Sequence, residues 1–456
     1  MSLDVVILAA GQGSRMRSRL PKVLHRLAGR SMIQRIVDAA GALEDARLHV
    51  VVGHGAEQIE TALAGQDINL VYQREQLGTG HAVAQALPAL GDGPVLILNG
   101  DAPLLTTATL SRLAENLNSP QLRLLSVIYP DPTGYGRIVR DSEGRVLSIV
   151  EQKDATSEQR AIKECNTGLM GTTGALLKQW LPQLSAENAQ GEYYLTDIVA
   201  LANANKVPLT AVQADSVEEV SGVNDRRQLA ALERWFQRCQ ADAIMAQGAG
   251  LADPERFDVR GTLSVGRDVF IDVGCVFEGE VSLGDGVTLG PYCVIKDASI
   301  GAETHIEAYT HIDGAETLGN NQIGPYARLR PGTRLAGHAK VGNFVETKKA
   351  DIGEGTKVNH LTYIGDATLG ANTNVGAGTI TCNYDGVNKH HTEIGNDVFV
   401  GSNTALVAPI TIADEVTIAA GSTLTRSVPS KHLAIGRSRQ VEKSGWERPK
   451  KKEQGK

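Results

Sequence analysis

The stretch IGNDVF-VGSNTA-LVAPIT-IADEVT-IAAGST-L, residues 394–424, places an aliphatic residue at every sixth position. A helix repeats every 3.6 residues and a strand every 2, so neither period explains a spacing of six. A six-residue period is typical of a parallel β-helix, in which the aliphatic residue points inward and the coils stack on one another. The period begins at Val265 and runs to Pro429, giving roughly two dozen repeats where about three suffice for stability. We therefore expect a β-helix domain at residues 248–456.

The sequence before residue 226 follows a different pattern. Short apolar runs alternate there with helical patterns, as in Val5–Leu8, Met32–Ala42, Leu48–Val52, Ala56–Ala64 and Val95–Leu98. This alternation predicts an α/β domain with a Rossmann-like, mostly parallel sheet over residues 1–226. One long helical pattern follows at residues 227–247, and we expect it to be a connector between the two domains.

Composition argues against several classes of function. A formal net charge of -7 disfavours a nucleic-acid-binding surface, and the basic tail at residues 448–452 is expected to be a short solvated terminus. No apolar run approaches the ~20 residues of a membrane span, and the first residues do not resemble a signal peptide. The five cysteines form no Cys-x-x-Cys pair, so neither a disulfide framework nor a zinc site is indicated. We expect a cytoplasmic protein that binds neither nucleic acid nor membrane.

A glycine-rich turn follows the first strand of the α/β domain. It reads Ala9-Ala10-Gly11-Gln12-Gly13-Ser14-Arg15-Met16 and leads to Pro21-Lys22. The backbone N–H groups of such a turn bind phosphates. Met16 stands where the dinucleotide fingerprint requires glycine, and the Gly-Lys-Ser/Thr of a P-loop is missing. The cations Arg15 and Lys22 suit a nucleoside triphosphate better than a dinucleotide.

These motifs resemble those of the sugar-phosphate nucleotidyltransferases, whose signature is Leu-Ala-Ala-Gly-x-Gly-x-Arg-Met followed by Pro-Lys. Further matches, in order, are Gln73-x-x-Gln76-Leu77-Gly78-Thr79-Gly80, Asn99-Gly100-Asp101-Ala102-Pro103-Leu104, Gly134-Tyr135-Gly136-Arg137-Ile138, Glu151, Asn166-Thr167-Gly168 and Gly222-Val223-Asn224. The resemblance implies that nucleotide and sugar are bound by Leu8, Ala9, Ala10, Gly11, Arg15, Lys22, Gln73, Gly78, Thr79, Asn99, Gly100, Asp101, Gly136, Glu151, Asn166 and Asn224.

The resemblance also implies Mg²⁺ at Asp101 and Asn224, since this ion prefers hard oxygen ligands. Asp101 follows a strand, at the end where open α/β sheets bind ligands. Taken alone, Asp101 could be a turn residue or helix cap, and Asn224 could cap the helix that follows it. The reaction implied is in-line attack of a sugar 1-phosphate on the α-phosphorus of UTP, with release of pyrophosphate.

His360 is the candidate for chemistry in the β-helix. It lies two residues after the inward Val358 and so should face outward, where a lone histidine is usually only a surface residue. Arg330 and Lys348, one coil apart, should stack at strand spacing, ~4.8 Å, and His360 should meet them around a corner or from a neighbouring subunit. A loop inserted at residues 382–392 interrupts the repeats, and such insertions often carry function.

This region resembles the bacterial bifunctional family that joins N-acetylglucosamine-1-phosphate uridyltransferase to glucosamine-1-phosphate N-acetyltransferase. The matching segments are Gly342-Asn343-Phe344-Val345-Glu346-x-Lys348-Lys349, His360-Leu361-Thr362-Tyr363-x-Gly365-Asp366 and Gly376-Ala377-Gly378-Thr379-Ile380-x-Cys382-Asn383-Tyr384-Asp385-Gly386. The resemblance spans essentially the whole chain. It implies a homotrimer of left-handed β-helices with His360 as general base, a role that suits a histidine at working pH. It further implies substrate binding by Arg330, Lys348, Tyr363 and Asn374, and acetyl-CoA binding by Ala377, Asn383, Tyr384, Ser402, Ala420 and Arg437.

We therefore expect an enzyme of UDP-N-acetylglucosamine synthesis, which supplies precursors of peptidoglycan and lipopolysaccharide. It would acetylate glucosamine 1-phosphate with acetyl-CoA and then couple N-acetylglucosamine 1-phosphate to UTP. In one alternative the β-helix is only a trimerisation scaffold for a uridyltransferase; in another the protein is a nucleotide-sugar-binding regulator without turnover. His360 and its cations argue against the first, and Lys22, Asp101 and Asn224 against the second. Gln12, Ser14 and Asn99 replace residues that are commoner in the family, with an effect that the sequence leaves open.

Overall fold

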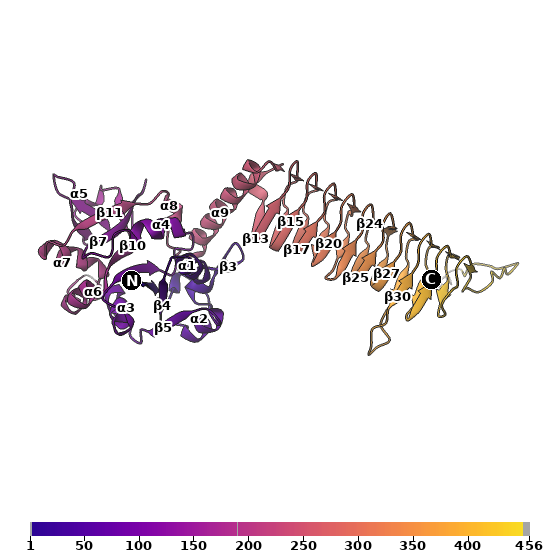
Figure 1. Ribbon diagram of the computed structural model, residues 1–456, viewed down its shortest axis with the longest axis horizontal. Helices are drawn as coiled ribbons and strands as arrows, with labels where there is room; N and C mark the ends of the chain where they lie inside the picture. The colour runs from indigo at the N-terminus through magenta and orange to yellow at the C-terminus, as the bar shows by residue number, and fades with distance from the viewer. Residues whose placement is uncertain (1, 189, 450–456) are drawn as a thin grey trace, which may run out of the picture. The chain divides into compact units, whose positions relative to one another are not determined.

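The computed structural model describes residues 2–188 and 190–449 (Figure 1). The chain forms two compact units that meet in sequence at Cys239 and Gln240. This division falls inside helix α9 (Arg226–Ala246), within the connector expected at residues 227–247. In the described part of the chain, no helix combines the length and apolar character that crossing a membrane requires.

Unit 1 contains the expected α/β domain, with a nine-stranded sheet in the order β11-β7-β10-β6-β1-β4-β5 and β8 and β9 attached to β10. All its central pairs are parallel except those made by β10. Its strands are β1 (Leu3–Leu8), β4 (Ala46–Val52), β5 (Ile68–Tyr72), β6 (Pro94–Asn99), β7 (Leu122–Ile128), β8 (Arg137–Arg140), β9 (Val146–Val150), β10 (Glu164–Thr173) and β11 (Leu209–Gln213), beside the hairpin β2 (Arg26–Leu27) and β3 (Arg30–Ser31).

The helices of unit 1 cover both faces of this sheet. They are α1 (Met32–Gly41), α2 (Ala56–Ala62), α3 (Thr79–Ala86), α4 (Thr107–Ala114), α5 (Ser157–Arg160), α6 (Gly174–Trp180), α7 (Ile198–Ala204) and α8 (Val217–Val220). Along β1, Val5 and Ile7 pack into the core on one face and Val6 into the core on the other, as a strand buried on both sides requires. The expected helices at Met32 and Ala56 begin where predicted and end one and two residues earlier.

The order of the strands in unit 1 places the predicted motifs together. β1 lies between β4 and β6, both parallel to it, and Leu8 pairs with Asn99 at their carboxyl ends. The glycine-rich turn after β1 and the Gly100–Asp101 segment after β6 therefore leave the sheet side by side. This is the edge of a parallel sheet at which ligands bind.

Unit 2 is the expected parallel β-helix, and its coils stack in Figure 1 along one axis. Its first sheet contains β12 (Gly250–Leu251), β14 (Phe270–Ile271), β16 (Thr288–Leu289), β18 (His305–Ile306), β21 (Gln322–Ile323), β24 (Lys340–Asn343), β26 (Lys357–His360), β28 (Asn374–Val375), β31 (Phe399–Val400), β34 (Thr417–Ile418) and β36 (Leu433–Ala434). We call this sheet face 1.

The other strands of unit 2 belong to a second sheet. Its main path contains β13 (Asp258–Val265), β15 (Val276–Leu283), β17 (Val294–Ile300), β19 (His311–Asp313), β22 (Arg328–Leu329), β25 (Glu346–Ile352), β27 (Tyr363–Leu369), β29 (Ile380–Cys382), β32 (Ala405–Val407) and β35 (Thr423–Leu424). We call it face 2. A branch holds β20 (Ala315–Thr317), β23 (Thr333–Leu335), β30 (Thr392–Ile394) and β33 (Ile410–Ile412). The periodic residues 394, 400, 406, 412, 418 and 424 are all buried, which confirms that they point inward.

The corner between face 1 and face 2 carries a ladder of stacked aromatic rings. Tyr292, Tyr309, Tyr326 and Phe344 occupy it in successive coils, with ring centroids 5.3, 5.1 and 5.3 Å apart. All four have positive φ, and Leu361 with φ 48° continues the series. The rings remain 46 to 55% exposed, so unit 2 displays an apolar ladder that ends beside His360.

Candidate active sites

A cavity of about 600 Å³ opens at the carboxyl ends of β1 and β6 in unit 1. Ten of the residues predicted from the sequence line it: Leu8, Ala9, Ala10, Gly11, Lys22, Gln73, Gly78, Thr79, Asn99 and Asp101. Glu192 also lines it, from a segment that no motif indicated. A Cβ at Gly78, which has φ 111°, would lie 2.6 Å from the carbonyl oxygen of Tyr193. Glycine at this position therefore lets the segment that carries Glu192 approach the cavity.

Lys22 and Asp101 line one side of this cavity, and Asn224 and Arg15, which do not line it, lie next to them. The Lys22 ammonium forms an ion pair with Asp101 Oδ2 and lies 3.5 Å from Asn224 Oδ1. Arg15 Nη2 donates to the same Asn224 oxygen at 2.8 Å. The backbone N–H of Val223 donates to the carbonyl of Asp101 at 2.8 Å, which holds the two segments together. The structure thus brings Asn224 beside Asp101, although 123 residues separate them, from 101 to 224.

Gly13 allows Lys22 to reach this position. It adopts φ 61°, and a Cβ there would lie 2.5 Å from Lys22 Cβ. A side chain at residue 13 would therefore push Lys22 away as well as strain the backbone. The Lys22 and Asp101 side chains keep 16 and 20% of their surface exposed, so a ligand in the cavity can reach both.

Gly136, Glu151 and Asn166 form a second group, adjoining Asn99. The N–H of Asn166 donates to the carbonyl of Gly136 at 2.9 Å, and a Cβ on Gly136 would lie 3.2 Å from Glu151 Oε1. Asn99 Nδ2 donates to the carbonyl of Thr167, the residue after Asn166, at 3.1 Å. Burial, with Asp154 and Asp197 nearby, raises the pKa of Glu151. A polar wall of this kind suits hydroxyl groups of a sugar.

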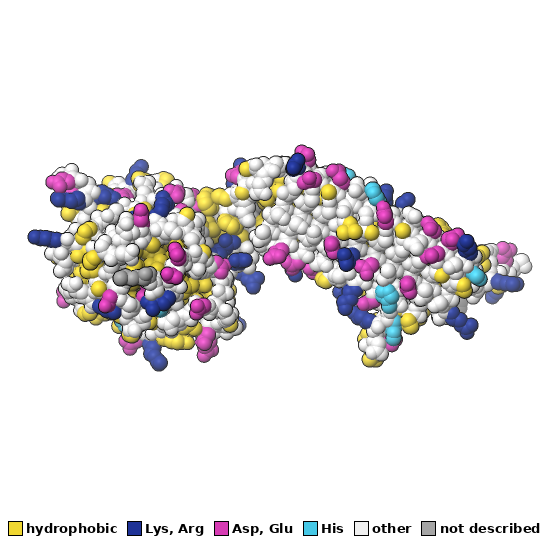
Figure 2. Space-filling model, in the orientation of Figure 1, with side chains coloured by type: hydrophobic (Ala, Val, Ile, Leu, Met, Phe, Trp, Pro, Cys, Tyr) yellow, Lys and Arg dark blue, Asp and Glu magenta, His cyan; other side chains and the backbone are white. Residues whose placement is uncertain are grey.

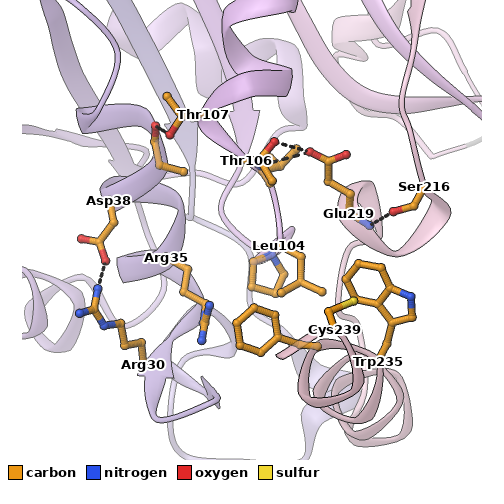
Figure 3. A pocket seen from close by; sticks show the side chains of 14 residues that line it. Arg30, Arg35, Asp38, Leu104, Thr106, Thr107, Ser216, Glu219, Trp235 and Cys239 are labelled. Carbon is orange, nitrogen blue, oxygen red and sulfur yellow. Dashed lines mark hydrogen bonds and ion pairs between the residues drawn. The ribbon is translucent and has the colours of Figure 1, made fainter. Parts of the chain in front are cut away.

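A separate cavity of about 580 Å³ adjoins the segment after Asp101 (Figure 3). Its lining is mainly apolar and includes Leu104, with Trp235 and Phe236 of the first half of α9. The Arg35 guanidinium lies 4.5 Å from the centre of the Phe236 ring, and burial lowers the pKa of Arg35. None of the residues predicted to bind substrate lines this cavity.

In unit 2, His360 belongs to a column of residues at the end of face 1. Asn343 and His360 are paired across β24 and β26, and His360 Nδ1 lies 2.9 Å from Asn343 Oδ1. The same register continues one coil at a time through Ala377, Ser402 and Ala420. Arg437 Nη1 donates to the Ala420 carbonyl at 3.0 Å. His360 and four of the six residues expected to bind acetyl-CoA therefore lie along one line.

The predicted cations lie around the corner, on face 2. Leu329 pairs with Thr347, which places Arg330 and Lys348 at one position of successive coils, as their spacing predicts. Arg330 is held by Glu346 at 2.7 Å. The ammonium of Lys389 lowers the pKa of Lys348, and Arg330 contributes to the same shift. Three cations thus gather here, as an anionic group would require.

Tyr363 and Asn383 lie beside these cations. Asn383 Nδ2 donates to the Tyr363 hydroxyl at 3.4 Å and to Asp366 Oδ2 at 2.5 Å. A Cβ at Gly365 would lie 2.7 Å from Tyr363 Cε1, so glycine makes room for this ring. Within the described residues, Asn374 and Tyr384 form no hydrogen bond to His360 or to the cations.

The inserted loop forms a small hairpin. Tyr384 bridges Lys389 in antiparallel fashion, and the His390 N–H donates to the Asn383 carbonyl at 2.8 Å. His390 lies 2.7 Å from Asp385, and this contact lowers the pKa of Asp385. Figure 2 shows basic and histidine side chains gathered where this loop projects from the β-helix.

Known proteins resemble the chain along its whole length. Residues 5–160 match the MobA-like NTP transferase domain, and residues 263–297 and 391–426 match the bacterial transferase hexapeptide. Proteins named bifunctional protein GlmU are 60% identical in Chromohalobacter salexigens, 58% in Marinobacter nauticus and 55% in Stutzerimonas stutzeri. The alignments cover 98 to 99% of this chain and 99 to 100% of those relatives. The chain belongs to the GlmU family.

Membership of the GlmU family makes this chain a bifunctional enzyme, with a uridyltransferase domain and an acetyltransferase domain. Both the expected family and the expected pair of activities are confirmed. A solved nucleotidyl transferase from Methanothermobacter thermautotroptrophicus is 22% identical over 52% of this chain and 99% of its own, at a TM-score of 0.37.

Three residues at these GlmU sites were not predicted from the sequence. Glu192 lies in a segment without a recognisable pattern, so nothing in the sequence indicated it. Lys389 lies inside the inserted loop, which the broken period did indicate. Asn343 belongs to a motif quoted for the resemblance, but its contact with His360 requires the register of the coils.

Proposed function

We propose that unit 1 transfers UMP from UTP to N-acetylglucosamine 1-phosphate, and that unit 2 makes this acceptor from glucosamine 1-phosphate and acetyl-CoA. In domain terms, residues 1–226 carry the first activity and residues 248–456 the second, joined by residues 227–247. Uridylyl transfer is supported by the contacts of Lys22 with Asp101 and Asn224 beside the cavity. Acetyl transfer is supported by the column of residues that contains His360.

For uridylyl transfer, the backbone N–H groups of the glycine-rich turn bind the triphosphate. Lys22 and Arg15 offset the charge that develops on the phosphates, and the group at Gly136, Glu151 and Asn166 binds the sugar. The attacking phosphate of the sugar is already an anion, so no side chain has to remove a proton. Rate enhancement then comes from positioning and charge neutralisation.

Asp101 and Asn224 are the residues that would hold Mg²⁺. No cluster of three or more His, Cys, Asp or Glu side chains that could hold a metal occurs among the described residues. However, Mg²⁺ commonly takes only one or two protein oxygens and completes its shell with phosphates and waters. Asp101 Oδ2 and Asn224 Oδ1 both approach the Lys22 ammonium, so two hard oxygens already converge on one cation. When bound, Mg²⁺ would neutralise phosphate charge beside Lys22.

For acetyl transfer, Arg330, Lys348 and Lys389 bind the phosphate of glucosamine 1-phosphate, with Tyr363, Asn374 and Asn383 around its sugar. Acetyl-CoA lies along the column of Ala377, Ser402, Ala420 and Arg437, with Tyr384 of the loop near its acetyl group. His360 accepts a proton from the sugar amine as the nitrogen attacks the thioester carbonyl. The C–S bond then breaks, and the leaving sulfur takes the proton from His360.

Supplying acetyl-CoA, glucosamine 1-phosphate, UTP and Mg²⁺ to the purified protein should release both CoA and pyrophosphate. Omitting acetyl-CoA should stop pyrophosphate release as well, because the acceptor is then missing. N-acetylglucosamine 1-phosphate added without acetyl-CoA should restore it. Pyrophosphate release from that acceptor without any CoA release in the full mixture would favour the alternative in which the β-helix is only a scaffold.

We also propose that the enzyme is a cytoplasmic homotrimer, in keeping with cysteines that remain free thiols. The exposed aromatic ladder supports a partner, since contiguous apolar patches on the surface of a protein commonly mark interfaces. The placing of His360 and the cations on opposite sides of one corner also supports a site completed by a neighbouring copy. Sedimentation at micromolar concentration should give three times the chain mass of 48.5 kDa. An active monomer in acetyl transfer would contradict the shared site.

A further inference from the structure

Asn343 and His360 occupy the same position in successive coils of the β-helix. β24 ends at Asn343 and β26 ends at His360, and the two residues are register partners. The Leu361 N–H donates to the Asn343 carbonyl at 3.1 Å, which fixes the backbone spacing at this point. The side chains meet across this gap, with Asn343 Oδ1 and His360 Nδ1 2.9 Å apart.

The chemistry of this contact selects one form of the imidazole. An amide oxygen has lone pairs and no hydrogen, so the hydrogen in the contact belongs to Nδ1 of His360. In a neutral histidine, a hydrogen on Nδ1 leaves Nε2 with a free lone pair. Among the described residues, Nε2 of His360 has no hydrogen-bond partner, and the side chain is exposed. Nε2 is therefore the ring nitrogen able to accept a proton.

The other neighbours of His360 cannot hold the hydrogen of its ring on Nδ1. Ala377, one coil further along the column, has only a methyl group. The carbonyl of His360 accepts hydrogen bonds from Thr362 Oγ1 at 2.6 Å and from the Gly378 N–H at 3.3 Å, but these hold the main chain and leave the ring free to turn. Glu346, the acidic residue in the same motif as Asn343, forms an ion pair with Arg330.

We propose that Asn343 is a positioning residue of the acetyl-transfer site, which holds His360 in the Nδ1–H form so that Nε2 removes the proton from the amine of glucosamine 1-phosphate. The inference rests on the proposed role of His360 as the base. Without Asn343 the ring can turn, and the hydrogen can move to Nε2, a form that cannot accept the proton. Fixing the correct tautomer of a catalytic histidine is a known use of a hydrogen-bond partner.

The Asn343→Leu variant should lower kcat for acetyl transfer by about 10- to 100-fold, less than the loss of the base itself. KM for glucosamine 1-phosphate should change little, because Asn343 does not touch the phosphate-binding cations. Asn343→Asp keeps an acceptor oxygen at this position and should retain most of the activity. Asn359→Leu, the same change one residue before His360, is the matched control and should leave kcat unchanged.

A double variant separates a positioning role from a general structural one. If Asn343 acts through His360, His360→Ala combined with Asn343→Leu should be no slower than His360→Ala alone. The inference is wrong if Asn343→Leu acetylates at the wild-type rate, or if it slows His360→Ala by its full single effect. A wild-type rate for His360→Ala would instead overturn the proposed function of His360.

Discussion

Replacing His360 with alanine is expected to lower the rate of acetyl transfer by about 10²–10⁴-fold, the usual contribution of a general base. The expectation rests on the place of His360 at the start of the column proposed to bind acetyl-CoA, around the corner from Arg330 and Lys348 on face 2. Uridylyl transfer from N-acetylglucosamine 1-phosphate should be unchanged, because that site lies in unit 1. Raised pH should restore part of the lost rate, since more of the amine is then already unprotonated.

His305→Ala provides the matched control for this change. His305 is also an exposed histidine on face 1 of the β-helix, in β18, and its Nδ1 lies 2.5 Å from Thr288 Oγ1. It lies three strands before His360 in face 1 and outside the column proposed to bind acetyl-CoA, so its removal should leave both activities intact. Equal rates for His360→Ala and His305→Ala would mean that the base lies elsewhere.

Replacing Asp101 with alanine is expected to lower uridylyl transfer by about 10²–10³-fold or more, the scale on which lost electrostatic stabilisation slows a reaction. The change removes the carboxylate assigned to Mg²⁺ and also leaves the Lys22 ammonium without its ion-pair partner. Acetyl transfer should be unaffected. Both rates can be measured on one preparation by release of pyrophosphate and of CoA.

Asp92→Ala controls for the loss of an aspartate near the other end of β6. Asp92 is an exposed residue that forms an ion pair with Lys178 at 2.7 Å, and such surface pairs contribute little to stability. This variant should transfer UMP at the wild-type rate. If Asp101→Ala did the same in excess Mg²⁺, the assignment of the metal to Asp101 and Asn224 would be wrong.

The fold of unit 2 could be predicted from sequence because one period determines which residues point inward. The period does not determine the register at the corners where a step of five residues interrupts it, as from Ile295 to Ile300 and from Thr347 to Ile352. Asp297, Lys349 and Asp366 lie in these short steps, and each adopts positive φ inside a strand that turns from one face to the next. Because none of these three residues is glycine, the sequence does not indicate their positive φ. The register of Lys348 against Gly365 therefore required the structure.

The site of unit 1 could be predicted in part for a different reason. Its motifs follow strands, and strand ends gather at one edge of a parallel sheet, so the turn after β1 and Asp101 were expected to be close. Glu192 was not predictable, because it reaches the cavity through the packing of Tyr193 against Gly78 and not through any local pattern. The ion pair of Lys22 with Asp101 likewise depends on tertiary contacts, above all the close approach to Gly13.

The two sites of this chain are expected to work independently on successive reactions. Mixing the Asp101→Ala and His360→Ala proteins tests this independence, since each variant retains the site that the other has lost. With acetyl-CoA, glucosamine 1-phosphate, UTP and Mg²⁺, neither variant alone should form UDP-N-acetylglucosamine at an appreciable rate. The mixture should form it at a rate approaching that of the wild type. A mixture as inactive as its components would mean that the two sites do not work independently.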